Sequence, residues 1–282
     1  MNSWRNVRVA EIMTGNVIRI SSDSTLYDSQ ELMTRSKLTR LVVVDRAARL
    51  RGIVTRRDLV RFLSRDRSGR PLDVILVREA MSSPVITLRP TDTLVQAARI
   101  MNRKGISSIV VTDDGEDILG IVTKTDLCFH FSLFSSKWKV KDCMTPKVLT
   151  VRTTHSIFFI ASVLARQGIS RVPVVDEDGK LRGIITLSDI AQTAPLMRPE
   201  TVRVKDKRVF YRGLFSPNAK LTSMTALDAM TPKPITVTAD DSLSHAAEIM
   251  VQRGISGLPV LDEEGRLRAI VTKSDIIRAL AT

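Results

Sequence analysis

The sequence predicts a mixed α/β (α+β) fold made of four copies of one small β-α-β-β-α unit. One motif occurs four times in the 282-residue chain, as GIVTRRDL at 52–59, GIVTKTDL at 120–127, GIITLSDI at 183–190 and AIVTKSDI at 269–276. A second motif precedes each copy, as EIMTG at 11–15, EAMSS at 79–83, DCMTP at 142–146 and DAMTP at 228–232. The methionine of the second motif and the aspartate of the first are 45 residues apart every time. Such constant spacing indicates one structural unit repeated along the chain.

Each unit is expected to open with a short strand and a helix. The β-rich stretches are VIRI at 17–20, VITL at 85–88, VLTV at 148–151 and ITVT at 235–238. A cluster of Ser, Thr and Asp follows each stretch, as is typical of a helix N-terminus. In the second unit the spacing of TLVQAARIMNRKG puts four apolar residues on one helical face: Leu94, Ala97, Ala98 and Met101. A glycine suited to a left-handed helix end follows in three units, as Gly105, Gly168 and Gly254, and the first unit lacks it.

A hairpin and a second helix complete each unit. The first hairpin strand is predicted from SIVVTD, RVPVVD and GLPVLD, and the second from LGIVT and RGIIT. The turns between them are Asp114-Gly115, Asp178-Gly179 and Glu264-Gly265. The last helix begins after the threonine, as in SDIIRAL. We therefore expect one small sheet with two helices on one face, and a unit of about 55 residues is too small to bury its apolar surface alone. The four units are expected to form two pairs.

These units predict the organisation of the chain. Repeat 1 spans residues 1–66, repeat 2 spans 67–134, repeat 3 spans 135–193 and repeat 4 spans 226–282. A basic insertion at 194–225 separates repeats 3 and 4. Within it, VRVKDKRVFY alternates in places as a strand or hairpin arm does. A structured linker is the simplest interpretation of this segment.

Positive charge is concentrated in two stretches. The net charge is +13 for the chain, +9 for residues 35–70 and +5 for residues 195–225, so the remainder is close to neutral. Such clusters suit phosphates, although a solvated basic face is an equally good interpretation. No stretch approaches the roughly 18 apolar residues that span a bilayer. The N-terminal sequence also lacks the apolar run of a signal peptide, so we expect a cytoplasmic protein with no membrane partner.

Three recurring motifs resemble the CBS domain (cystathionine β-synthase motif): an M-T/S-P start, a G-I-S-x-x-P-V-x-D middle and a G-I-V-T-x-x-D-h end. Two CBS repeats associate into a Bateman module. Four in one chain resemble the gamma regulatory subunit of AMP-activated protein kinase and its stand-alone archaeal relatives. The resemblance implies two modules in a flat disc, adenine nucleotides bound in clefts between paired repeats, and regulation of a partner protein. The sequence departs from the pattern at Ala269, where the other repeats have glycine, and in repeat 1, with its RAAR turn and its LTRLVVVD.

The T-x-x-D motif has two interpretations. The threonine suits a helix N-cap and the aspartate the third helical position, which describes a capping box. Capping boxes favour the longer Glu or Gln, yet all four repeats use Asp, and a carboxylate at a helix N-terminus can instead accept hydrogen bonds from a ribose diol. The CBS resemblance implies that the aspartate holds the ribose and that the nearby Thr or Ser contacts ribose or phosphate. The candidate residues are Thr55, Asp58, Thr123, Asp126, Thr186, Asp189, Thr272, Asp275 and Ser170.

The rest of the predicted site is an apolar slot for the base and cations for the phosphates. The slot candidates are Val17, Val85, Val148, Ile235, Ile106, Ile169 and Ile255, for which ordinary core positions are the alternative. Arg40 and Arg171 stand at the sequence position that the resemblance assigns to phosphate contacts. Repeats 2 and 4 have Ser108 and Gly257 at the same position. Clefts served by repeats 1 and 3 are therefore expected to prefer the more highly phosphorylated nucleotide. Further cations inside the motif either add to this charge or belong to a solvated helix start: Arg56, Arg57, Lys124 and Lys273.

No catalytic machinery is recognisable in the sequence. It contains no G-x-x-x-x-G-K-[ST] phosphate loop, no G-x-G-x-x-G fingerprint and no evident nucleophile with its base. Cys128, His130 and Cys143 fit no standard zinc spacing, so no metal site is predicted. We therefore expect a non-enzyme without a catalytic cofactor.

The sequence thus predicts a regulatory, energy-sensing protein that binds AMP, ADP or ATP, as a monomer or a homodimer. One alternative is a nucleic-acid-binding CBS protein that uses the basic surface at 35–70 and 198–220. The second stretch mixes cations with aromatic residues: Arg203, Lys205, Lys207, Arg208 and Arg212 with Phe210, Tyr211 and Phe215. Another alternative is an S-adenosylmethionine sensor, because that ligand offers the same ribose diol.

Overall fold

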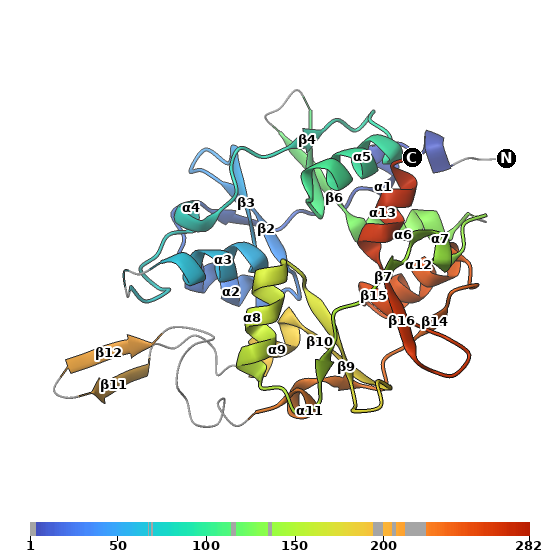
Figure 1. The fold of residues 1–282 in the computed structure, drawn as a ribbon. Coiled ribbons are helices and arrows are strands. Elements are labelled where there is room, and N and C mark those ends of the chain that lie inside the picture. Colours follow the sequence, from blue (N-terminus) through green and yellow to red (C-terminus); the bar gives the residue numbers. More distant parts are fainter. Residues whose placement is uncertain are drawn as a thin grey trace. The chain divides into compact units, whose positions relative to one another are not determined.

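The computed structural model describes residues 4–66, 68, 70–113, 117–134, 137–193, 200–204, 207–211 and 224–282. The chain divides into two compact units (Figure 1). Unit 1 comprises Met1–Ser135 and Ile276–Thr282, and unit 2 comprises Ser136–Asp275. Repeats 1 and 2 therefore share unit 1, whereas repeats 3 and 4 share unit 2 except for the end of repeat 4. The predicted association of repeats in pairs is confirmed.

The elements of repeats 1 and 2 follow the predicted order. Those of repeat 1 are η1 Trp4–Asn6, α1 Val9–Ile12, β1 Arg19–Ser21, α2 Leu26–Arg35, β2 Arg40–Val44, β3 Leu50–Thr55 and α3 Arg56–Arg65. Those of repeat 2 are α4 Val77–Ala80, β4 Thr87–Leu88, α5 Leu94–Lys104, β5 Ser108–Thr112, β6 Ile118–Thr123 and α6 Lys124–Ser132.

Repeats 3 and 4 follow the same order with an added hairpin between them. Repeat 3 contains α7 Val140–Cys143, β7 Thr145–Pro146, β8 Val151–Arg152, α8 Ile157–Gln167, β9 Arg171–Val175, β10 Leu181–Thr186 and α9 Leu187–Thr193. The hairpin is β11 Glu200–Val204 and β12 Lys207–Tyr211. Repeat 4 contains α11 Ala226–Ala229, β13 Thr231–Pro232, β14 Val237–Thr238, α12 Leu243–Gln252, β15 Gly257–Leu261, β16 Leu267–Thr272 and α13 Lys273–Leu280.

Each repeat folds around one small sheet. In repeat 2, β4 lies parallel to β5, and β5 pairs antiparallel with β6. The same neighbours recur as β1-β2-β3, β8-β9-β10 and β14-β15-β16. The two longer helices of a repeat contact each other, α5 with α6 and α8 with α9, as Figure 1 shows for the second pair. The predicted β-α-β-β-α order is therefore confirmed.

The first long helix of each repeat ends as its sequence predicts. Gly105 ends α5 in the left-handed conformation, with φ 64°. Repeat 1 lacks the glycine, and Lys37 takes the same backbone conformation there, with φ 54°. The predicted apolar face of α5 is completely buried, with no exposed surface at Leu94, Ala97, Ala98 or Met101.

A one-turn helix precedes each M-T motif, which the sequence analysis did not predict. These helices are α1, α4, α7 and α11, and the segment containing each one crosses to the other repeat of its pair. The residue before each short helix makes a β-bridge to the N-cap of the partner's first long helix. The bridges are Arg8 with Thr93, Leu76 with Thr25, Lys139 with Ser242, and Thr225 with Ser156.

The methionine of the M-T motif packs on the hairpin of the partner repeat. A Cβ added to Gly52 would lie 2.5 Å from Met81 Sδ, and one added to Gly120 would lie 2.8 Å from Met13 Sδ. The glycine of G-I-V-T therefore makes room for the methionine of the other repeat. The two motifs that define the repeat in the sequence thus meet across the pair rather than within one repeat.

The residues after each methionine extend the partner's sheet. In unit 2, β13 of repeat 4 pairs antiparallel with β10 of repeat 3, and β7 of repeat 3 pairs with β16 of repeat 4. In unit 1, single bridges join Ser82 to Ile53 and Thr14 to Ile121. Each pair is therefore joined by an exchange of starting segments.

The insertion contains an antiparallel hairpin, with register from Glu200↔Tyr211 to Val204↔Lys207. This agrees with the strand prediction for VRVKDKRVFY. Residues 194–199, 205–206 and 212–223 of the insertion and the predicted Asp114-Gly115 turn lie outside the described residues. None of the helices that the structure describes has both the length and the apolar character to cross a membrane.

Candidate functional site

The four T-x-x-D motifs share one geometry. Each threonine ends the second hairpin strand, and each aspartate lies in the first turn of the next helix. In repeats 1 to 4 the aspartate Oδ2 accepts the threonine backbone N–H at 2.9, 2.7, 2.7 and 2.7 Å. The same oxygen accepts the threonine hydroxyl at 2.6, 2.8, 2.7 and 2.7 Å. The motif is therefore a helix-capping arrangement in every repeat.

The capping box forms although its acidic residue is the shorter aspartate rather than the usual Glu or Gln. Thr55 Oγ1 also accepts the backbone N–H of Asp58 at 3.2 Å, which completes the reciprocal box. The contact is possible because the helix starts immediately after the threonine, so a short side chain reaches its backbone. The box uses only Oδ2, and a carboxylate has a second oxygen with its own acceptor capacity. Capping and ligand binding are therefore compatible uses of one side chain.

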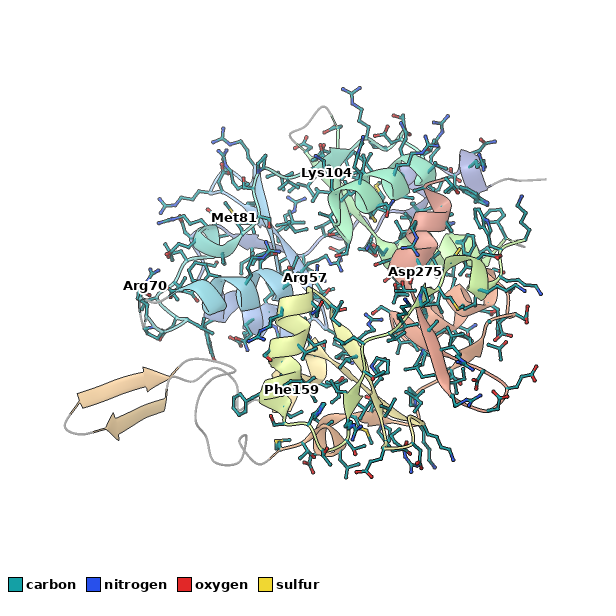
Figure 2. All side chains as sticks on the ribbon, in the orientation of Figure 1. Arg57, Arg70, Met81, Lys104, Phe159 and Asp275 are labelled. Carbon is teal, nitrogen blue, oxygen red and sulfur yellow. The ribbon has the colours of Figure 1, made fainter. Side chains whose placement is uncertain are left out.

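The second carboxylate oxygen has different surroundings in different repeats. Asp58 Oδ1 accepts the hydroxyl of Ser82 at 3.2 Å, and Arg61 Nη1 lies 3.8 Å from it. Asp275 Oδ1, at the start of α13 (Figure 2), accepts the hydroxyl of Thr145 at 3.3 Å. Asp58 and Asp275 are only 7% and 3% exposed.

Two of the candidate sites, those of Asp58 and Asp275, contain residues of both repeats of a pair. Ser82 belongs to the M-T motif of repeat 2, and Asp58 to repeat 1. Thr145 belongs to the M-T motif of repeat 3, and Asp275 to repeat 4. The sequence analysis placed the sites between paired repeats but did not identify which starting motif accompanies which aspartate. It also missed Ser82 and Thr145, although the hydroxyl that follows the methionine in all four repeats was a visible signal.

Arg40 extends from repeat 1 to repeat 2. It lies opposite Thr55 in the β2–β3 register, yet its Nη1 donates to the Ser107 carbonyl at 2.7 Å. Burial lowers the pKa of Arg40, and the negative charge of Asp126 partly offsets that effect. The guanidinium therefore serves the surroundings of Asp126 rather than those of the aspartate in its own repeat.

Arg171 makes the equivalent connection in unit 2. It is opposite Thr186 in the β9–β10 register, and its Nη2 donates to Ser256 Oγ at 2.6 Å. Burial lowers the pKa of Arg171 to about 10, against the opposing charge of Asp275. The arginines of repeats 1 and 3 thus lie near the aspartates of repeats 2 and 4, a relationship that the sequence alone left undefined.

The apolar candidates have mixed surroundings. Val17 and Val85 are half-buried and pack against a cluster shared by repeats 1 and 2, formed by Val42, Val110 and Ile118. Ile169 packs against the main core of unit 2. The remaining candidates are partly buried, namely Val148, Ile106 and Ile255, and Ile235 is 39% exposed. Val17, Val85 and Ile169 therefore pack in the core or between repeats, whether or not they also contact a ligand.

The cations inside T-x-x-D also differ from one another. Lys273 is 7% exposed at the start of α13, whereas Lys124 and Arg56 are half-buried. Arg57 is exposed on α3 (Figure 2). Ser170 Oγ accepts a 3.4 Å hydrogen bond from Arg171 Nη2. Near Asp275, the buried Lys273 of the motif adds a second cation to Arg171.

Ion pairs with carboxylates occupy part of the basic stretch at 35–70. Five of the arginines in residues 35–70 form ion pairs with carboxylates: Arg46, Arg49, Arg51, Arg61 and Arg70. In the insertion, Lys205, Arg212 and Phe215 lie outside the described residues, as do the side chains of β11 and β12. Within the described residues, no three His, Cys, Asp or Glu side chains are grouped to hold a metal ion, and Cys128 is buried in α6.

Comparison with known families agrees with this architecture. The CBS domain model matches residues 9–65, 77–132, 140–194 and 226–282, which is well over half of the chain. The chain therefore belongs to the CBS domain family, with four repeats paired as in Bateman modules.

Several relatives span almost the whole chain. Protein MJ1225 of Methanocaldococcus jannaschii is 25% identical over 98% of this chain and 99% of its own. The crystal structure of MJ1225, proposed as an archaeal homologue of g-AMPK, matches with a TM-score of 0.79 over 98% of this chain and 100% of that one. A 33.4 kDa protein from a ribosomal RNA operon of Thermofilum pendens is 26% identical over 97% of this chain and 92% of its own. A conserved protein from Pyrococcus horikoshii shares the fold, with a TM-score of 0.68 and 20% identity over 97% of this chain and 100% of that one.

Proposed function

We propose that the protein is a non-catalytic regulatory protein that binds adenine nucleotides at the T-x-x-D sites between paired repeats. The observation that carries this proposal is that the two carboxylate oxygens of the motif aspartate have different roles. Oδ2 caps the helix in all four repeats, and Oδ1 is a second acceptor at a helix N-terminus. A ribose diol donates to such an oxygen, and the phosphates that follow it suit the positive end of a helix.

Arg40 and Arg171 supply the phosphate contacts in this proposal. A guanidinium is a planar donor that pairs well with phosphate oxygens. Both arginines lie near an aspartate of the partner repeat, Asp126 or Asp275. The sites of Asp126 and Asp275 are therefore proposed to prefer the nucleotide with more phosphates. The remaining polar contacts are proposed to come from Ser170, next to Arg171, and from the threonines of the T-x-x-D motifs.

The adenine is proposed to lie against the apolar residues that follow the crossing M-T segments. Val17 and Val85 already contact an inter-repeat cluster, so a base inserted there would touch both repeats. Val148 and Ile235 are the equivalents in unit 2, and Ile106, Ile169 and Ile255 approach from the adjoining turn. A ligand that contacts both repeats can change their arrangement only if it binds one arrangement more tightly.

The relatives support a regulatory role. MJ1225, which matches this chain from end to end, is itself proposed as a homologue of g-AMPK. By analogy, we propose that nucleotide occupancy is read by a partner protein. The basic stretch at 35–70 gives no comparable argument for nucleic acid, because five of its arginines are already paired with carboxylates.

Isothermal titration calorimetry on nucleotide-stripped full-length protein tests the proposal. AMP, ADP, ATP and S-adenosylmethionine are titrated separately. At least one adenine nucleotide is expected to bind, and changing all four motif aspartates to asparagine is expected to abolish its binding, with far-UV circular dichroism as the control for folding. Absence of heat with AMP, ADP and ATP would refute the proposal, and heat with S-adenosylmethionine alone would replace it.

A further inference from the structure

The four aspartates are not equivalent at their second carboxylate oxygen. Ser82 donates to Asp58 and Thr145 donates to Asp275, each across the pair. The equivalent residues are Thr14 for Asp126 and Thr231 for Asp189, and in the part of the chain that the structure describes no such bond joins them. One aspartate in each unit is therefore hydrogen-bonded at Oδ1 by its partner repeat.

Burial follows the same division. Asp58 and Asp275 are 7% and 3% exposed, whereas Asp126 and Asp189 are half-buried. The two aspartates bonded by the partner's hydroxyl are thus also the two that are closed to solvent. Hydrogen bonding from the partner repeat and low exposure therefore mark the same two aspartates.

The hydroxyl and a ribose diol would compete for the same oxygen. Ser82 and Thr145 lie in the segments that exchange between repeats, beside the methionines that pack on the partner's hairpin. Their hydroxyl–carboxylate bonds therefore join the two repeats as well as covering Oδ1. A ribose diol that binds Oδ1 must first break this hydrogen bond, which helps to hold the two repeats together.

We propose that Ser82–Asp58 and Thr145–Asp275 are inter-repeat latches, which keep one site of each unit closed until a ligand breaks the hydrogen bond. This inference rests on the proposed function and specifies its regulation. Ligand binding at Asp58 or Asp275 exchanges a bond between repeats for a bond to the ligand. Ligand occupancy of the closed sites is consequently coupled to how the two repeats of the pair are arranged. These sites also bind the ligand more weakly than they would without the latch.

The test compares AMP binding to the full-length protein and to the variants Ser82→Ala and Thr145→Val. Ser82→Ala is expected to raise the affinity of the Asp58 site for AMP by about tenfold, and Thr145→Val that of the Asp275 site. The reason is that AMP no longer has to displace a hydrogen bond from the hydroxyl to the charged carboxylate. The control is Thr14→Val, which changes the equivalent residue where no latch exists and is expected to leave AMP binding unchanged. Reduced or unchanged affinity in both latch variants would overturn the proposal.

A ligand-free measurement separates the latch from the proposed function. If wild-type protein binds no adenine nucleotide, the proposed function fails, but the latch can still be judged from urea unfolding. Ser82→Ala and Asp58→Ala are expected to shift the unfolding midpoint non-additively, because each removes the Ser82–Asp58 hydrogen bond. Additive shifts would overturn the latch, whatever the titrations show.

Discussion

The guanidinium of Arg171 occupies the space where a side chain on Gly257 would begin. A Cβ at Gly257 would lie 2.5 Å from Arg171 Nη1 and 3.2 Å from Arg171 Cδ. The two residues occupy the same slot in repeats 3 and 4, after Ser170 and Ser256. One repeat therefore supplies the cation and the other supplies the space for it. The two repeats of unit 2 are similar in fold but have different roles.

Gly257→Ala is expected to destabilise the protein by about 1–3 kcal/mol, the usual cost of overpacking a well-filled position. The added methyl group must displace the guanidinium from Ser256, because the backbone around β15 is fixed by its pairing with β16. Urea unfolding measures the change. The matched control is Gly257→Ala in an Arg171→Ala background, where the cost should largely disappear. An equal loss of unfolding free energy in both backgrounds would show that Gly257 is required for a contact other than the one with Arg171.

Gly120→Ala is expected to weaken the association of repeats 1 and 2 by about 1–3 kcal/mol. A Cβ there would meet Met13 Sδ at 2.8 Å and the Thr14 carbonyl oxygen at 3.0 Å, and the backbone oxygen cannot move as a side-chain end can. Ala269, at the equivalent position in repeat 4, is the natural comparison, since it is completely buried beside β7. Ala269→Gly should therefore change the unfolding free energy less than Gly120→Ala. The opposite ranking would contradict the crossing contact.

Ala48→Gly is expected to stabilise the protein by about 0.5–1 kcal/mol. Ala48 has φ 60° in the RAAR turn, where repeats 3 and 4 have Gly179 and Gly265 with φ 77° and 74°. A left-handed conformation costs a non-glycine residue about 1–2 kcal/mol, and the greater freedom of glycine in the unfolded chain offsets part of the gain. Thermal unfolding measures the effect. Ala47→Gly, in the same turn without a positive φ, should be neutral or destabilising.

Asp45 makes stability depend on pH in acid. Partial burial would raise its pKa, but hydrogen bonds from the Arg49 and Ala47 backbone and from the Arg51 and Arg49 side chains outweigh this and hold the pKa at about 2. The carboxyl's ordinary pKa is 3.8, so the folded state favours the charged form. The stabilisation is fully present by about pH 5, well above the ordinary pKa, and is lost as the pH falls through 3.8 towards 2.

Urea unfolding between pH 2 and pH 5 checks this dependence. Asp45→Asn should be less stable than wild type at pH 5, and the difference should shrink towards pH 2. Asp73→Asn, an exposed position outside the turn, is the control. A difference that stays constant over the whole interval would exclude a charge effect at Asp45.

The repeat, its element order and its pairing could be predicted because each leaves a local signal. The apolar face of α5 and the left-handed end at Gly105 follow from spacing and residue type. The RAAR turn of repeat 1 lacks the usual glycine, yet the hairpin forms, because Asp45 accepts the N–H groups of Ala47 and Arg49. Asp262 does the same for Glu264 and Arg266 in repeat 4. That shared aspartate was present in the sequence, but its contribution depends on the closed turn.

The site was predicted only in part. The aspartates and threonines of T-x-x-D were identified, and their capping geometry was one of the two interpretations. Ser82 and Thr145 were not identified, because the sequence shows only that the methionine and the aspartate of one repeat are always 45 residues apart. That separation records a repeated unit and carries no information about which copies touch.

The sequence by itself determined that this chain is four similar units, each with a sheet, two long helices and a carboxylate at a helix start. Local periodicity and capping residues suffice for this, because they act within a few residues along the chain. Only the tertiary structure decided that the starting segments exchange between repeats, that Arg40 and Arg171 donate to a serine of the partner repeat, and that Oδ1 accepts a hydroxyl of the partner repeat in two repeats. Those features arise from side-chain packing between distant segments, where single atoms such as the missing Cβ of Gly257 decide which contact forms.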